Sequence, residues 1–175
     1  MSCQPPITSQ NSATKAVVAL GSNLAHGGLE PAEILAAAIE RLRTLSISAL
    51  LVSRTHVTEP EGLAVGAPAF CNAVAVLEPA TSLSAECLLT ALLTIEAEFG
   101  RTRAAPPSGA DYSSRTLDLD LISCRDEVHD SPRLQLPHPR TAQRDFVLAP
   151  LAEIWPDLVL PQQSLSVLDL LRRHS

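Results

Sequence analysis

The chain has 175 residues, of which 46% are hydrophobic and 18% are charged. This length and composition predict one globular domain that is large enough to bury a core. The formal net charge of −6 argues against a general surface for nucleic acids or membranes. No apolar run reaches the length of a membrane-spanning helix either. From the charge and this absence together, we expect neither nucleic acid nor membrane as a partner.

The beginning of the chain and its cysteines indicate a cellular compartment. Residues 1–15 are polar and lack the charged and apolar regions of a signal peptide, so we expect a disordered leader before one domain at residues 16–175. The four cysteines show no paired spacing typical of a metal site, which predicts buried free thiols at Cys3, Cys71, Cys87 and Cys124. Free thiols are typical of the reducing cytoplasm, where we expect the protein to reside.

The first elements predicted along the chain are a strand, a helix and a second strand. Ala16–Leu20 is short and apolar, which predicts a buried strand that ends in the polar turn Gly21-Ser22-Asn23. A helix is predicted from Pro31 to Leu45, because proline suits the first helical turn and apolar residues recur at helical spacing. Ile47 to Val57 is rich in β-branched residues and predicts the next strand.

The second half of the chain continues with a strand, a helix and another strand. Phe70 to Leu77 predicts a strand, and Ser84 is a suitable N-cap for a helix that runs to Phe99 and ends at Gly100. A long loop then leads to a strand in which leucine and aspartate alternate. The remaining predictions are a short hairpin at 127–136 and helices at 139–144, 147–154 and 164–173.

This order of elements indicates the fold class. Strand, helix, strand, strand, helix, strand is the pattern of an α+β ferredoxin-like sandwich, in which two helices pack on one face of an antiparallel sheet. The segments after the last strand form a C-terminal extension of that sandwich.

The strand with alternating leucine and aspartate is the best candidate for a functional site. Side chains of a strand alternate between faces, so Asp118 and Asp120 project to one side while the neighbouring leucines face a core. Two adjacent carboxylates repel each other unless a cation lies between them, and oxygen ligands favour Mg²⁺. Arg115 adds a planar donor suited to phosphate. The motif therefore suggests metal-assisted phosphoryl chemistry, and the alternative is a solvated face of an edge strand.

Five short strings occur in order along the chain: Ala19–Leu24, Phe70–Val74, Gly100–Arg103, Arg115–Asp120, and Leu136–Arg140 with Arg144–Leu148. Together they resemble the 6-hydroxymethyl-7,8-dihydropterin pyrophosphokinase family, over roughly residues 17–161. The resemblance implies the ferredoxin-like fold. It also implies transfer of the terminal pyrophosphate of ATP to the hydroxymethyl oxygen of the pterin, with release of AMP, in folate biosynthesis.

The resemblance further implies roles for individual residues. The implied metal ligands are Asp118 and Asp120, which would hold two Mg²⁺ ions against the phosphates of ATP. The implied catalytic residues are Arg101, Arg115, Asp118 and Asp120. The implied contacts with ATP are Arg103, Tyr112, His138 and Arg144. The implied lining of the pterin pocket is Thr58, Phe70, Asn72 and Phe146.

Simpler roles are open for several of these residues when they are considered without the resemblance. Arg101 and Arg103 follow the end of a helix, where they would complement the helix dipole, and Arg115 would pair with a surface acid. His138 and Tyr112 would be ordinary exposed loop residues. The flat side chains of the pterin pocket would be core residues, and its asparagine would bond to the backbone.

The sequence also departs from the family pattern in the loop before the metal strand. Relatives often carry Gly-Pro before the arginine, where this chain has Ser113-Ser114, and the loop from Arg103 to Arg115 is longer than in short relatives. Glu96 matches an acidic family position and is expected to be supportive rather than catalytic. We expect a monomeric enzyme that binds small molecules. The alternatives are a catalytically silent paralogue that binds a pterin or nucleotide, and a ferredoxin-like regulatory module.

Overall fold

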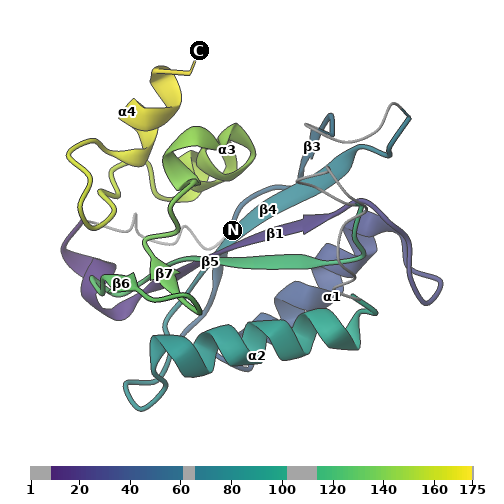
Figure 1. Cartoon of the computed structure of the whole chain (residues 1–175), viewed down its shortest axis with the longest axis horizontal. Helices are drawn as coiled ribbons and strands as arrows, with labels where there is room; N and C mark the ends of the chain where they lie inside the picture. Colours follow the sequence, from purple (N-terminus) through teal and green to yellow (C-terminus); the bar gives the residue numbers. More distant parts are fainter. Residues whose placement is uncertain (1–8, 61–65, 102–113, 175) are drawn as a thin grey trace.

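The computed structural model describes residues 9–60, 66–101 and 114–174 (Figure 1). Its first element is the 3-10 helix η1 (Ser9–Thr14), which forms the last part of the expected leader. Residues 1–8, the rest of that leader, lie outside the described residues. After η1 the chain enters an α+β domain with an antiparallel sheet, as the order of predicted elements indicated.

A five-stranded sheet runs through the middle of the molecule (Figure 1). Its strands are β1 (Ala16–Ser22), β2 (Leu51–Val52), β3 (His56–Thr58), β4 (Phe70–Leu77) and β5 (Asp118–Cys124). β4 and β5 flank β1, and both β2 and β3 pair with the outer edge of β4. The register places Gly21 of β1 opposite Asn72 of β4 and Asp118 of β5. Residues predicted to be functional therefore meet at one end of the three central strands.

The prediction of one continuous strand from Ile47 to Val57 is wrong, because the structure has two short strands there. Both β2 and β3 remain on β4, and the interruption between them is explained by Ser53. The Ser53 N–H donates to the Val74 carbonyl at 2.9 Å, but the Val74 N–H donates to the Ser53 hydroxyl at 2.9 Å instead of to a backbone carbonyl. A side chain thus replaces one bond of the β-ladder.

Two helices cover one face of the sheet, as predicted (Figure 1). α1 (Pro31–Arg43) has a proline in its first turn, and α2 (Ala85–Glu98) begins after Ser84, whose hydroxyl accepts from the Cys87 N–H. The apolar faces of both helices pack against the sheet. This core includes Leu20, Leu35, Leu42, Leu88, Leu92, Leu117, Leu119 and Leu121. The leucines that alternate with the two aspartates are therefore buried, as the period of the strand predicts.

The opposite face of the sheet is covered by α3 (Asp145–Ile154) and α4 (Val167–Arg172) (Figure 1). Leu148, Leu151 and Trp155 are buried there against Val74 and Val76. The sequence predicted these helices only as an extension. They complete the domain because β4 is apolar on both faces, so both faces must be covered.

The connection from β5 to α3 positions the start of α3. It contains the hairpin β6 (His129–Asp130) and β7 (Gln135–Leu136), which confirms the predicted excursion at 127–136. The helix predicted from Pro139 to Arg144 is instead the short 3-10 helix η2 (Thr141–Gln143). A new helix starts at Asp145 rather than continuing from η2, because the backbone at Arg144 is extended.

Two further expectations are changed or limited by the structure. Cys87 is exposed and Cys71 is half-buried, so the prediction of buried thiols is right only for Cys124 among the three described cysteines, all of which are free. A cysteine in a helical pattern is buried only when it lies on the packed face, which Cys87 does not. Within the described ranges, no helix has the length and apolar character needed to cross a bilayer.

Candidate active site

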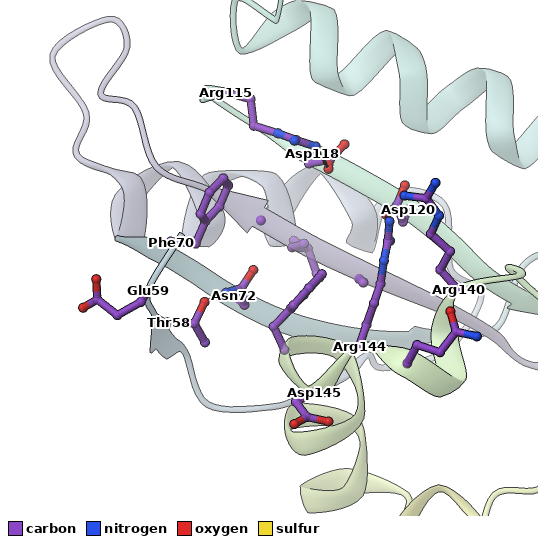
Figure 2. Close-up of a pocket in the computed structure, with 15 residues that line it drawn as sticks. Thr58, Glu59, Phe70, Asn72, Arg115, Asp118, Asp120, Arg140, Arg144 and Asp145 are labelled. Atoms are coloured by element: carbon purple, nitrogen blue, oxygen red, sulfur yellow. Dashed lines mark hydrogen bonds and ion pairs between the residues drawn. The ribbon is translucent and has the colours of Figure 1, made fainter. Parts of the chain in front are cut away.

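A cavity of about 400 Å³ lies where β1, β4 and β5 meet the start of α3 (Figure 2). This volume is typical of sites for small molecules. Eight of the predicted site residues line it: Thr58, Phe70, Asn72, Arg115, Asp118, Asp120, Arg144 and Phe146. They come from four segments that are far apart in the sequence, so their convergence is a property of the fold.

The two aspartates lie on the same face of β5, as the alternation predicted, and both point into the cavity (Figure 2). Asp118 forms ion pairs with Arg101 and Arg115, and Asp120 accepts a hydrogen bond from Arg144 Nη1 at 2.9 Å. Burial alone would raise the pKa of the Asp118 carboxyl, but the charges of Arg115 and Arg101 outweigh burial and hold this pKa below its usual value. Asp118 is therefore ionised at neutral pH.

Arg115 is held in place through its backbone. The Arg115 N–H donates to Asn23 Oδ1 at 2.7 Å, and the Asn23 N–H donates back to the Arg115 carbonyl at 3.1 Å. Asn23 is buried and also donates to the carbonyl of Pro68, just before β4. The sequence showed this asparagine only as part of a polar turn. The structure shows that it ties the arginine to two neighbouring loops.

Arg101 lies behind Asp118 rather than in the wall of the cavity. Its Nη1 donates to the Leu117 carbonyl at 2.8 Å and to the Asp118 carboxylate, and it lies 3.3 Å from Oε1 of Glu96. The interpretation of Arg101 as a mere complement to the helix dipole is therefore wrong, because its guanidinium reaches the aspartate strand.

The other side of the cavity is suited to a flat ring with polar edges. The Asn72 amide donates to Thr58 Oγ1 at 2.8 Å, which fixes its orientation beside Phe70. The guanidinium carbon of Arg115 lies 5.8 Å from the centre of the Phe70 ring, and that of Arg144 lies 5.5 Å from the centre of the Phe146 ring. Each aromatic ring thus carries a cation near its face, at a distance where the two attract.

Three predicted ATP contacts remain outside this cavity or outside the described residues. His138 lies against β5, where its N–H donates to the Ile122 carbonyl at 2.8 Å, and it lines a neighbouring cavity of about 270 Å³. Burial lowers the pKa of His138, although the nearby Asp120 carboxylate opposes this effect, so the imidazole is neutral at neutral pH. Arg103 and Tyr112 lie outside the described residues.

Several residues that line the cavity were given no role from the sequence. They are Gly21, Glu59, Arg140, Gln143 and Asp145. Arg140 and Asp145 belong to the quoted strings. Arg140 lies two residues after the predicted His138 and Asp145 lies just before the predicted Phe146, so proximity in the sequence was an available signal for both. Figure 2 shows Arg140 beside Asp120, and Glu59 and Asp145 on the side of the cavity opposite the aspartate strand.

The carboxylate oxygens of this cavity can bind a magnesium ion only together with oxygens from a ligand. Within the described residues, no group of three or more His, Cys, Asp or Glu side chains is placed to hold a metal ion. Asp118 and Asp120 nevertheless supply carboxylate oxygens on one face of one strand. Mg²⁺ commonly binds through one or two carboxylates together with waters and the phosphates of a substrate. The pair therefore fits a magnesium ion that is shared with a phosphorylated ligand.

Acidic oxygens, arginines and aromatic rings around one cavity define a site of the class found in phosphoryl-transfer enzymes. Comparison with known proteins identifies the family. The family model for 7,8-dihydro-6-hydroxymethylpterin-pyrophosphokinase (HPPK) matches residues 17–156. The chain therefore belongs to the HPPK family.

Individual relatives agree with this assignment. The chain is 43% identical over 145 residues to the 2-amino-4-hydroxy-6-hydroxymethyldihydropteridine pyrophosphokinase of Pseudomonas aeruginosa, which covers 82% of each chain. It is 38% identical over 151 residues to the enzyme of the same name from Haemophilus influenzae, covering 86% of this chain and 87% of the relative.

Solved structures share the fold. Wild-type HPPK-DHPS of Plasmodium falciparum superposes with a TM-score of 0.66 at 12% sequence identity, over 91% of this chain and 44% of the other. The chain thus spans less than half the length of that structure. The likeness at this identity concerns the fold alone.

Proposed function

We propose that the protein transfers the terminal pyrophosphate of ATP to the hydroxymethyl group of 6-hydroxymethyl-7,8-dihydropterin and releases AMP, a step of folate biosynthesis. Family membership supports this reaction. The observation that supports this reaction in this chain is that Asp118 and Asp120 line the same cavity as Phe70, Asn72 and Phe146. Such a cavity brings a triphosphate and a flat ring within reach of each other.

The pterin side of the reaction uses shape and hydrogen bonds. Phe70 and Phe146 stack on the two faces of the ring, and the Asn72 amide pairs with its amide-like edge because it carries both donors and an acceptor. Thr58 keeps that amide in one orientation through the bond at 2.8 Å. The hydroxymethyl oxygen then lies towards β5, where the charged groups gather.

The phosphate side uses positive charge. The hydroxyl oxygen forms a bond to the β-phosphorus, the bond from that phosphorus to the oxygen that bridges to the α-phosphate breaks, AMP leaves with this oxygen, and the proton of the hydroxyl passes to solvent water. Arg115 and Arg144 line the cavity and are placed to stabilise the charge that develops on the phosphate oxygens. Two Mg²⁺ ions held by Asp118 and Asp120 would supply further positive charge and lower the pKa of the attacking hydroxyl.

The finer assignments belong to the same proposal. Arg103, Tyr112, His138 and Arg144 contact ATP, and Arg101 acts with Arg115. The strand order β2-β4-β1-β5, with two helices on one face, supports a ferredoxin-like sandwich with α3 and α4 as an added layer. The protein acts as a cytoplasmic monomer on small molecules, through one domain at residues 16–175.

An assay of AMP release tests the reaction. The purified protein, given ATP and Mg²⁺, is expected to release AMP only when hydroxymethyl-dihydropterin is added, and to give no ADP. Asp118→Ala and Asp120→Ala are expected to abolish this release and to stay folded, whereas Asp126→Ala, an exposed aspartate just after β5, is expected to match the unmodified chain. Release of AMP at the normal rate by either cavity variant would refute the scheme.

A further inference from the structure

Glu96 is a buried carboxylate next to the site but not in it. Its side chain is 2% exposed, and among the described residues it is the one charged residue in the fully buried set. A buried charge is unfavourable unless partners compensate it. Glu96 does not line the cavity, so it does not meet the substrates directly. Its buried charge must therefore be compensated by partners within the protein.

The end of α2 brings Glu96 and Arg101 together. Gly100 has a φ of +75°, and the helix ends with the N–H of Gly100 donating to the Ala97 carbonyl and the N–H of Arg101 donating to the Glu96 carbonyl. This pair of bonds is the Schellman motif, which reverses the chain after a helix. The backbone of Arg101 is thereby held over the last turn of α2, close to the carboxylate that its side chain meets.

The carboxylate of Glu96 also binds the aspartate strand. Its Oε1 accepts from the Leu119 N–H at 2.9 Å, and Leu119 lies between the two aspartates of β5. The same oxygen lies 3.3 Å from Arg101 Nη1. The Leu119 N–H thus fixes the Glu96 side chain to β5. The carboxylate lies beside the Arg101 guanidinium, outside the lining of the cavity.

Arg101 therefore has two anionic partners with different surroundings. Asp118 faces the cavity, where a cation can compete for its oxygens and a phosphate for its arginine partners, whereas Glu96 is shut off from the cavity. If Asp118 turned to a magnesium ion, Arg101 would lose that partner. Glu96 would remain at the same distance from its guanidinium.

We propose that Glu96 is a positioning residue that keeps the guanidinium of Arg101 against the aspartate strand when Asp118 exchanges its arginine partners for magnesium. The inference rests on the proposed function. It assigns to Glu96 an effect on turnover that passes through Arg101, without any contact between Glu96 and a substrate.

The kinetic test removes the charge of Glu96 and keeps its shape. Glu96→Gln retains an oxygen for the Leu119 N–H, and we expect kcat to fall by about tenfold or more while KM for both substrates changes little. In an Arg101→Ala background the same change is expected to add no further loss, because the effect passes through the arginine. The matched control is Glu98→Gln on the same helix, which removes an exposed pair with Arg41 and is expected to leave kcat unchanged.

A second readout does not depend on turnover. In Asp118→Asn, the Nε–Hε signal of Arg101 in an NMR spectrum, assigned with Arg101→Lys, is expected to stay sharp and slow to exchange, and to broaden when Glu96→Gln is added, because Glu96 then no longer supplements the bond from Nη1 to the Leu117 carbonyl. A signal already broad in Asp118→Asn, or one that the added Glu96→Gln leaves unchanged, would overturn the inference. So would normal kcat in Glu96→Gln, or an equal loss with and without Arg101. If the unmodified chain released no AMP, the proposed function would fail, and the NMR result would still decide the role of Glu96.

Discussion

The glycine on the floor of the cavity offers a sharp test of where the pterin lies. Gly21 is on β1 between Asn72 of β4 and Asp118 of β5. A Cβ atom added there would lie 3.3 Å from Asn72 Oδ1 and 3.9 Å from a ring carbon of Phe70. The backbone at this glycine is not in the left-handed region, so alanine fits the strand without backbone strain.

The expected effect on stability is small and the expected effect on binding is large. Glycine within a strand costs roughly 0.5–1 kcal/mol relative to alanine, but the new Cβ lies 3.3 Å from Asn72 Oδ1 and this tight contact offsets the gain, so the melting temperature of Gly21→Ala is expected to change by no more than about 4 °C. In the proposed complex, the added methyl group takes up space under the pterin ring and pushes against the Asn72 amide. A misplacement of this size is expected to lower kcat/KM for the pterin roughly a hundredfold.

Two measurements and one control variant check this prediction. Thermal unfolding gives the stability, and titrations with pterin and with an ATP analogue give the two affinities separately. Gly28→Ala is the control: its added methyl group meets nothing within 4 Å, but its φ is +82°. That variant is expected to lose about 1 kcal/mol or more of stability and to keep its affinity for the pterin. Normal pterin affinity in Gly21→Ala would show that the ring does not lie on this floor.

Three further predictions concern the core, the charged site and the thiols. Leu148→Ala on α3 removes a fully buried side chain and is expected to lower the free energy of unfolding by roughly 2–5 kcal/mol in urea titrations; a loss well below this range would mean that α3 is not part of the cooperative core. The pKa of the Asp118 carboxyl is lower in the folded protein than in the unfolded chain. The ionised carboxylate therefore stabilises the fold at pH values above the unfolded pKa of about 3.9, and this stabilisation is lost as the pH falls through the folded pKa. The stability gap between the unmodified chain and Asp118→Asn is therefore expected to be largest at neutral pH and to shrink below about pH 4, and a gap that does not change with pH would contradict the ion pairs described. Burial raises the pKa of the Cys124 thiol to about 11, so peptide mapping after iodoacetamide treatment at pH 8 should find exposed Cys87 labelled and Cys124 protected until the protein unfolds; equal labelling of both in the folded protein would contradict this.

The parts of the fold that were predictable are those with a strong local pattern. The alternation around Asp118 and Asp120 fixes which side chains face the core, and the bounds of β4 follow from an apolar, β-branched run. Ser84 caps α2 as its hydroxyl suggested. In each case one short segment contains the whole signal, so tertiary contacts need only preserve it.

The features that were missed depend on contacts between distant segments. The break at Ser53 depends on a hydroxyl that meets Val74 of another strand, and the burial of Glu96 depends on Arg101 and on the backbone of β5. The lining role of Arg140 depends on where η2 begins, because Arg140 is the residue just before it. None of these follows from the spacing of residues within a single element.

The central claim is that one cavity holds the triphosphate at the aspartates and the flat ring between the two phenylalanines. A crystal structure of the complex with magnesium, a non-hydrolysable ATP analogue and hydroxymethyl-dihydropterin tests it most directly. We expect metal density between the phosphates and the carboxylates of Asp118 and Asp120, with the pterin ring between Phe70 and Phe146 and the Asn72 amide at its edge. A structure in which both carboxylates keep only their arginine partners, and the ring lies elsewhere, would contradict the account.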